Sequence, residues 1–421
     1  MDNNEKIFIQ IASYRDPELL LTIKDCISKS KNPENLVFSI AWQHSNDDEW
    51  DNLDEYRNDV RFKIIDINHK KAKGPCWARY LLQQQYNGEK YTLQIDSHHR
   101  FQENWDFELI TELKKLQEKG HQKPILTGYI PSYEPTTDPE GRVHTPWKMN
   151  FDRFSPDGNV HFLPSSIDNF RDLTEPIPAR FYSAHFCFTI GQFCLEVQHD
   201  PDYYFHGEEI SISVRAYTWG YDLFHLHKVL IWHYYTRKGS IKQWDDDKSW
   251  YLKNDYSHYK NRKLFGMEED GKDVYFSDFG FGPKRTLEQY ERYSGISFKK
   301  RGVQRYTLEN NLPPNLNIEN QNDYENSFLI RFKHCIDINT NELPYDDYTF
   351  WAVSFVDENG DEMYREDASP NEIKKIKSEG DDKYKIWRSF ETTKFPSKWY
   401  VWAHSSEHGW GKRLEGSLNF K

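Results

Sequence analysis

The sequence has no long apolar run. No stretch approaches the roughly 18 to 20 consecutive apolar residues that cross a bilayer, and the opening MDNNEKIFIQIASY has no basic segment followed by an apolar one. We therefore expect neither a membrane segment nor a signal peptide. The five cysteines are an odd number and include no C-x-x-C pair. This pattern favours reduced thiols and a cytoplasmic protein over a disulfide framework.

Several catalytic motifs are also missing. No G-x-x-x-x-G-K-[ST] loop occurs, and no G-x-G-x-x-G follows a predicted strand, so neither a P-loop nor a Rossmann dinucleotide site is expected. No G-x-S-x-G serine elbow is present. The formal net charge of -12 and the pI near 5.8 argue against a general affinity for nucleic acid. A local basic groove for one phosphate-bearing ligand is compatible with this charge.

What the chain does contain is length and aromatic area. Its 421 residues are more than one core usually holds, so two or more domains are expected. Aromatic residues make up 16% of the chain, which indicates packed globular structure and excludes a disordered chain.

The first 130 residues alternate strand-like and helix-like segments. The strand-like runs are residues 6–13, 36–43, 62–68, 91–96 and 124–130. Apolar residues at helical spacing follow Asp16, which we interpret as a helix cap, and fill residues 74–86 and 104–120. This alternation predicts an α/β fold with a mostly parallel sheet flanked by helices. In such sheets ligands bind beyond the carboxyl ends of the strands.

The middle of the chain is less regular. Residues 131–178 are rich in Pro, Asp and Gly without a sustained period, so we expect a functional loop on the acceptor side of a site. Regular structure is predicted to return as a strand at 179–191, a helix at 208–220 and a strand at 223–235. A polar stretch then precedes a last helix within 279–295.

From about residue 325 the pattern changes to alternating apolar and polar residues with turn residues between them. Asn359–Gly360 is a strong hairpin signal. We predict a small antiparallel β-sandwich-like domain over 325–421. A linker at 301–324 would join it to an α/β domain over 1–300.

The segment LQIDSHHRF suggests a metal site at the end of a buried strand. Asp96 and His98 lie two residues apart, so their side chains point the same way on a strand. One carboxylate and one imidazole suit Mn²⁺ or another borderline divalent ion, although a capped turn is the alternative. HLHKVLIWHYYTR offers His225, His227 and His233 as candidates for a third ligand. His225 and His227 share one strand face and could form a pair of their own, but we interpret these two as ordinary strand histidines.

Other charged residues allow two interpretations each. Glu208 and Glu209 begin a predicted helix, where acids interact favourably with the helix dipole but also suit a catalytic or sugar-binding pair. Arg15 and Arg79 are candidate phosphate or base contacts. Arg79 follows the basic loop KKAKGP, whose lysines we expect to be solvated.

Five separated blocks resemble one enzyme family in order and spacing. They are IFIQIASYRDPELLLTIKDCISKSKNPENL, GPCWARYLLQQQY, DSHHRF, HGEEISISVRAYTWGYDLF and YSGISFKKR. The family is that of UDP-GlcNAc:polypeptide α-N-acetylglucosaminyltransferases, such as cytoplasmic hydroxyproline GlcNAc-transferases. It is similar to the mucin-type polypeptide GalNAc-transferases. The resemblance covers about residues 5 to 300.

The resemblance implies a GT-A fold, a UDP-GlcNAc donor, a divalent cation such as Mn²⁺, retention of sugar configuration and a hydroxyl acceptor on a polypeptide. The implied metal ligands are Asp96, which would also lie near the ribose, His98 and His233. The implied nucleotide contacts are Ser13, Tyr14, Arg15 and Arg79. Glu208 and Glu209 would face the donor sugar or the acceptor.

Two alternatives to a polypeptide acceptor are open. The same fold and donor class could serve a glycan, a small molecule or a modified nucleic acid. From another class, a non-catalytic protein could bind carbohydrate through its aromatic β domain. The intact D-x-H, His233 and the glutamate pair argue against this third hypothesis.

Overall fold

The computed structural model describes residues 5–419. The chain divides into two compact units, each with its own core. The first consists of Met1–Phe151, Phe162–Gly295 and Tyr306–Asn317, and the second of Asp152–His161, Ile296–Arg305 and Ile318–Lys421. None of the helices within residues 5–419 has the length and apolar character needed to cross a membrane.

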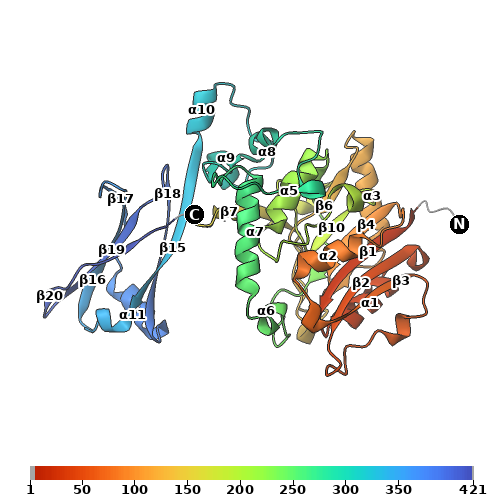
Figure 1. Cartoon of the computed structure of the whole chain (residues 1–421), viewed down its shortest axis with the longest axis horizontal. Coiled ribbons are helices and arrows are strands. Elements are labelled where there is room, and N and C mark those ends of the chain that lie inside the picture. Colours follow the sequence, from red (N-terminus) through yellow and green to blue (C-terminus); the bar gives the residue numbers. More distant parts are fainter. Residues whose placement is uncertain (1–4, 420–421) are drawn as a thin grey trace. The chain divides into compact units, whose positions relative to one another are not determined.

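The first unit is built on an eight-stranded sheet with the order β3-β2-β1-β4-β10-β6-β11-β9 (Figure 1). Strands β10 and β9 run antiparallel to their neighbours, and the other pairs are parallel. This mostly parallel sheet confirms the predicted fold class. The strands are β1 (Ile7–Tyr14), β2 (Leu36–His44), β3 (Phe62–Asn68), β4 (Tyr91–Asp96), β6 (Pro124–Thr127), β9 (Ile177–Pro178), β10 (Phe186–Ile190) and β11 (Asp222–His225).

Helices cover both faces of this sheet. Because successive side chains on a strand point to opposite faces, Phe186 and Phe188 of β10 pack into one core and Cys187 into another. The helices on the first face are α1 (Leu19–Ser28) and α3 (Trp105–Glu118), and those on the other are α2 (Pro75–Gln83) and α5 (Glu208–Thr218).

The predicted strand over 223–235 is wrong in one respect, because the structure divides it. Strand β11 ends at His225, and β12 (Ile231–His233) pairs instead with β5 (His99–Phe101) in a separate two-stranded sheet. The run is apolar on both sides of the break, so its pattern does not show the turn. This turn brings His233 back towards the end of β4.

The expected loop over 131–178 was also wrong in part, since it contains the strands β7 (Trp147–Phe154) and β8 (Val160–Ser166), which pair with each other. The polar stretch after residue 235 contains α6 (Gln243–Asp246) and α7 (Trp250–Leu264). Helix α7 buries mainly polar side chains, such as Asn261, which donates to the Gly207 carbonyl. A helix with a polar buried face leaves no hydrophobic period to detect.

The last predicted helix of this half of the chain is present but shorter. Helix α8 (Leu287–Ser294) begins at a capping box between Thr286 and Gln289 and ends at Gly295, which has φ +67°. The remaining helices are α4 (Phe193–Glu196), α9 (Arg305–Leu308), α10 (Gln321–Asn326) and α11 (Pro370–Glu379).

The second unit contains two antiparallel sheets, with orders β13-β14-β15-β18 and β17-β16-β19-β20, and β21 also pairs with β19. Side chains of both sheets, such as Ile336 and Trp351, share one core. The strands are β13 (Ile296–Ser297), β14 (Gly302–Gln304), β15 (Phe328–Asn339), β16 (Tyr348–Val356), β17 (Glu362–Arg365), β18 (Lys383–Thr392), β19 (Lys398–Ser405), β20 (Gly409–Trp410) and β21 (Leu414–Ser417). The predicted antiparallel character is confirmed.

Candidate functional site

Asp96 is the last residue of β4, at the carboxyl end of the sheet. Its Oδ1 accepts a hydrogen bond from Arg79 Nη2 at 2.8 Å. Its Oδ2 lies 3.5 Å from Nε2 of His233 and 3.8 Å from Nε2 of His98. Burial opposes ionisation, but the nearby His233 and the positive charge of Arg79 hold the pKa of Asp96 well below its usual value. Asp96 is therefore a carboxylate between two imidazoles.

Asp16 fixes the orientation of His98. Its Oδ2 lies 2.7 Å from Nδ1 of His98 and accepts a hydrogen bond from the Ser97 hydroxyl at 2.7 Å. Arg237 lies 3.2 Å from the same oxygen. A carboxylate beside Nδ1 keeps the proton of a neutral imidazole on that nitrogen. Nε2 of His98 faces Asp96 and is the ring nitrogen that can bind a metal.

His233 supplies the second imidazole. It pairs with His99 across β12 and β5, and this pairing sets its ring beside His98 with centroids 4.7 Å apart. Both ring nitrogens are buried and have no hydrogen-bond partner among the described residues. Burial lowers the pKa of His233 to about 4, so the ring is neutral. A buried imidazole without a partner calls for a ligand.

The three side chains fit a divalent cation. One oxygen or nitrogen from each of Asp96, His98 and His233 lies within 4.8 Å of the others. One carboxylate and two imidazoles are the donor set of borderline divalent ions such as Mn²⁺. The structure thus brings together the three predicted metal ligands from β4, the segment after it and β12.

Arg79 connects this cluster to a second carboxylate. The guanidinium is buried on α2 and donates from Nη1 to Glu208 Oε1 at 2.6 Å as well as to Asp96. The other oxygen of Glu208 accepts from the Cys76 thiol at 2.7 Å. Burial opposes ionisation, but the positive charge of Arg79 lowers the pKa of Glu208 to about 2. Both oxygens of Glu208 are therefore occupied within the protein.

Glu209 has different surroundings. Its two oxygens accept hydrogen bonds from the Ala184 backbone N–H and from the Tyr129 hydroxyl, each at 3.0 Å. Burial raises the pKa of Glu209 to about 7. The Tyr129 ring stacks on His185, which in turn stacks on His233 with centroids 4.4 Å apart. Glu209 is thus linked, through the rings of Tyr129 and His185, to the cluster of Asp96, His98 and His233.

The predicted nucleotide contacts at the end of β1 lie in different settings. Ser13 is fully buried, and its hydroxyl has no hydrogen-bond partner among the described residues. The Tyr14 hydroxyl donates to Asp246 Oδ2 at 2.6 Å. Arg15 donates to both oxygens of Asp48, at 2.6 and 2.9 Å, and to Asp246 at 3.1 Å. The Arg15 side chain is therefore already paired with two acids.

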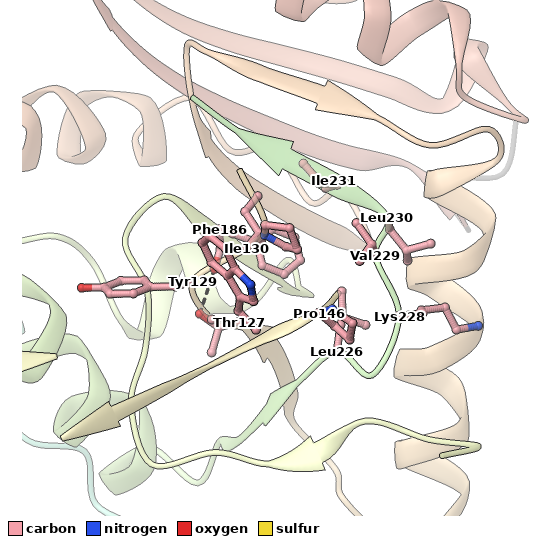
Figure 2. A pocket seen from close by; sticks show the side chains of 13 residues that line it. Thr127, Tyr129, Ile130, Pro146, Phe186, Leu226, Lys228, Val229, Leu230 and Ile231 are labelled. Carbon is pink, nitrogen blue, oxygen red and sulfur yellow. Dashed lines mark hydrogen bonds between the residues drawn. The ribbon is translucent and has the colours of Figure 1, made fainter. Parts of the chain in front are cut away.

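A small cavity lies beside the turn between β11 and β12 (Figure 2). Its volume is about 20 Å³, little more than one water molecule needs. Its walls are mainly apolar, and the side chain of Lys228 points away from it towards α3, where it pairs with Glu108 and Glu112. His225 is separately engaged by the Thr127 carbonyl and the Met149 N–H. The cavity and His225 belong to the packing of this turn.

A family model described as Glycosyltransferase (GlcNAc) matches residues 6–58 and 50–300. The chain belongs to this glycosyltransferase family. It is accordingly a glycosyltransferase, which confirms the enzyme class predicted from the sequence blocks. The match includes every residue of the candidate site, since these lie between Ser13 and Asp246.

Three solved structures are similar to this glycosyltransferase at low sequence identity. GalNAc-T7 with UDP, GalNAc and Mn²⁺ aligns at TM-score 0.46 and 13% identity, over 62% of this chain and 49% of that one, so the chain spans about half its length. S. aureus TarS 1–349 with UDP-GlcNAc aligns at TM-score 0.35 and 14% identity, over 57% and 61%. S. aureus TarS aligns at TM-score 0.38 and 10% identity, over 98% and 77%. No curated protein matches the chain.

Several residues of this glycosyltransferase site have no local signal in the sequence. The sequence predicts Asp16 only as a helix cap, yet α1 starts at Leu19 and Asp16 holds His98. Asp48 and Asp246, which hold Arg15, gave no signal because isolated acids are common in an acidic chain. Their partners are 33 and 231 positions away, so no local motif connects them.

Proposed function

We propose that this glycosyltransferase transfers GlcNAc from UDP-GlcNAc to a hydroxyl group, with a divalent cation, Mn²⁺ first, held by Asp96, His98 and His233. The observation that supports the proposal is the convergence of these three donor atoms at the carboxyl end of β4 in a chain of the GlcNAc-transferase family. Ligands of open α/β sheets bind at this end of the strands.

The protein groups around the cation site have distinct tasks in this proposal. When bound, the cation would offset the negative charge that develops on the departing diphosphate. Asp16 keeps Nε2 of His98 free to bind, and Arg79 keeps Asp96 ionised. The acceptor hydroxyl attacks from the face that the diphosphate leaves, so the sugar keeps its configuration.

The two glutamates divide between positioning and substrate contact. Glu208 has both oxygens occupied by Arg79 and Cys76, so we assign it to holding Arg79 against Asp96. Glu209, beside Tyr129 and near the His185 ring, is assigned to orienting hydroxyls of the donor sugar or of the acceptor. Contact of Glu208 with substrate hydroxyls, or a role of Glu209 in holding Arg79, would contradict this assignment.

Ser13, Tyr14 and Arg15 are proposed to line the nucleotide together with Arg79. The buried Ser13 hydroxyl has an unused hydrogen-bond capacity, and Arg15 can reach a phosphate only if its bonds to Asp48 or Asp246 exchange. The link between Arg15 and Asp246 would therefore open when the donor binds.

On the acceptor side, we propose a hydroxyl group of a polypeptide. The enzyme itself is proposed to be cytoplasmic, and residues 131–178 are proposed to form the acceptor side of a catalytic domain over 1–300. A β domain over 325–421 would follow the linker at 301–324. A glycan or small-molecule acceptor is the second candidate, and the same donor assay with peptide and glycan acceptors in parallel separates the two.

The test is UDP release from a panel of UDP-sugars, measured with Mn²⁺ and with EDTA. The proposal predicts turnover of UDP-GlcNAc above UDP-GalNAc and UDP-glucose, lost in EDTA. Preference for another UDP-sugar would contradict the donor assignment, and turnover that EDTA leaves unchanged would contradict the cation site.

A further inference from the structure

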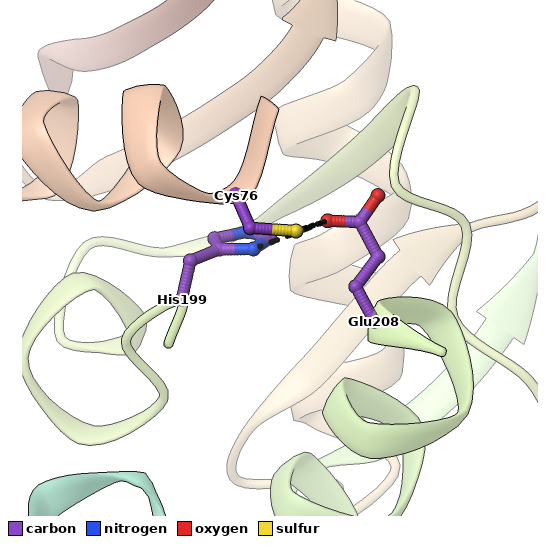
Figure 3. Close-up of side chains that lie close together, drawn as sticks. All are labelled: Cys76, His199 and Glu208. Atoms are coloured by element: carbon purple, nitrogen blue, oxygen red, sulfur yellow. Dashed lines mark hydrogen bonds and ion pairs between the residues drawn. The ribbon is translucent and has the colours of Figure 1, made fainter. Parts of the chain in front are cut away.

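A second cluster of ligand-type side chains lies behind Arg79, outside the cation site (Figure 3). Cys76 is the second residue of α2, His199 follows α4, and Glu208 is the first residue of α5. All three side chains are buried. Their Sγ, imidazole nitrogen and carboxylate oxygen lie within 4.8 Å of one another. Figure 3 shows the thiol and the imidazole pointing at the carboxylate.

Hydrogen bonds fix the tautomer of His199. The amide nitrogen of Gln94 donates to the Ala184 carbonyl at 2.7 Å, so its oxygen is the atom that faces His199 Nε2, also at 2.7 Å. The opposite amide orientation would set two carbonyl oxygens against each other. Nε2 therefore carries the proton, and Nδ1 of His199 presents a lone pair.

That lone pair faces other electron-rich atoms. Nδ1 of His199 lies 3.6 Å from Glu208 Oε2, and the same oxygen lies 2.7 Å from Cys76 Sγ. The thiol has one proton, which can satisfy only one of the two acceptors. Buried acceptors facing one another without enough protons are costly unless a cation lies between them.

We propose that Cys76, His199 and Glu208 form a zinc site. Thiolate, neutral imidazole and carboxylate are the ligands that Zn²⁺ selects in proteins. Binding replaces the thiol proton: Cys76 loses H⁺ to solvent as the S–Zn bond forms, and no electron is transferred. Gln94 on His199 and Arg79 on Glu208 are the outer hydrogen-bond partners that orient zinc ligands.

Distance and charge agree with this assignment. Zinc bonds of 2.0–2.3 Å in a tetrahedron separate ligand atoms by about 3.3–3.7 Å. The 3.6 Å between His199 and Glu208 already matches. The 2.7 Å between Cys76 and Glu208 must lengthen by about 1 Å, as it will when the bridging proton leaves. The thiolate and one carboxylate neutralise the ion, so Arg79 and Asp96 stay a pair.

The site would tie α2 to the start of α5 and hold Arg79 behind Asp96. This consequence for Asp96 depends on the proposed function, but zinc binding itself does not. The two metal sites also differ in chemistry, because only the one at Cys76 contains sulfur.

Cobalt tests the inference directly, because a thiolate bound to Co²⁺ gives a charge-transfer band in the near ultraviolet. The full chain is produced with cobalt in place of zinc, and its absorption and cobalt content are measured. The proposal predicts the band in the wild type from one cobalt bound at Cys76, whereas cobalt bound at Asp96, His98 and His233 has no sulfur ligand and gives no such band. Cys76→Ser should lose the band, whereas Cys194→Ser, a buried thiol of the same unit, should keep it.

Bound cobalt without the band, no bound cobalt, or a band that survives Cys76→Ser would each overturn the zinc site. If Cys76→Ser does not fold, comparison of the wild-type spectrum with that of Glu208→Gln decides, since this variant keeps the thiol but should lose the band. His98→Ala separates the two proposals. It should lose Mn²⁺-dependent UDP release and keep the cobalt band.

Discussion

The side chain of Asp16 bonds both to the backbone near α1 and to His98 in the site. The Oδ1 atom of Asp16 accepts from the Glu18 N–H near the start of α1, while Oδ2 holds the His98 ring. His98 follows β4 and Asp16 follows β1, so the parallel pairing of these strands sets their distance. The same residue therefore orients the proposed metal ligand His98 and shapes the start of the neighbouring helix.

Asp16→Asn is predicted to weaken Mn²⁺ binding by about 10- to 100-fold, because the partner of a metal-bound imidazole loses its charge. Free Mn²⁺ in a titration followed by electron paramagnetic resonance measures the change. Asp222→Asn is the matched control. Asp222 lies away from the site, and its Oδ2 is 2.8 Å from Nδ1 of His121. Equal affinity in Asp16→Asn and wild type would show that Asp16 only shapes the backbone.

Asp51 is a buried acid whose ionisation should change the stability of the protein. It accepts from the Trp42 indole at 2.6 Å, and burial raises the pKa of Asp51 to about 6. A folded-state pKa above the unfolded value contributes stability below pH 4 that is lost as the pH rises to about 6. Relative to wild type, Asp51→Asn should therefore gain up to about 3 kcal/mol between pH 4 and 7.

Urea unfolding of both proteins at pH 4 and 7 measures this gain. Asp47→Asn, an exposed acid of the same loop, should follow the wild type at both pH values. A stability difference between Asp51→Asn and wild type that does not change with pH would mean that Asp51 does not titrate in this range.

Helix α6 holds the Arg15 side chain through its last residue. Asp246, its last residue, bonds to both Tyr14 and Arg15. A part-exposed pair of this kind contributes about 0.2–1 kcal/mol. Asp246→Asn is therefore predicted to lower the KM for UDP-GlcNAc by about two- to fivefold, because Arg15 is released.

Initial rates over a range of UDP-GlcNAc concentrations give this KM. Asp245→Asn is the control, since Asp245 bonds to the Lys242 N–H on the same helix and not to Arg15. A raised KM in Asp246→Asn alone would mean that Asp246 itself contacts the donor.

The elements that the sequence predicts well are those with a clean period. Strand β4 matches its predicted range, and α3 lies within residues 104–120. The break between β11 and β12 was missed because both strands are apolar, and α7 because it buries polar side chains. Contacts across the fold were harder still: Cys76 and Glu208 lie 132 positions apart, and no local spacing shows that they meet.

The metal-type site was predictable to the extent that its signal is local. Asp96 and His98 follow from D-x-H at the end of a strand, but His233 came from the family resemblance, since three histidines lie within nine residues. Its position opposite His99 depends on the turn after β11, which the apolar pattern conceals.

At the scale of the whole molecule, the family match and the candidate site lie in the same part of the chain. The matched residues end at 300, and the site residues all belong to the first unit. The strands from Phe328 onward build a separate core around residues such as Trp351. Ligands of the site should therefore stabilise one core more than the other.

Calorimetry is predicted to show this difference as two transitions, of which Mn²⁺ and UDP shift only one. A ligand at 100 times its Kd adds about 2.7 kcal/mol, which raises the midpoint of a unit of this size by a few degrees. In His98→Ala the same addition should shift neither transition. An equal shift of both transitions would contradict the separation into two units.

The most direct test of the central claim is UDP release from UDP-GlcNAc in Mn²⁺ by wild type, His98→Ala and His121→Ala. His121 is a partly exposed histidine paired with Asp222, so its variant controls for loss of an imidazole as such. We expect turnover by wild type and His121→Ala, and a loss of at least 100-fold in His98→Ala at unchanged thermal stability. Full turnover by His98→Ala would contradict the assignment of Asp96, His98 and His233 as the cation site.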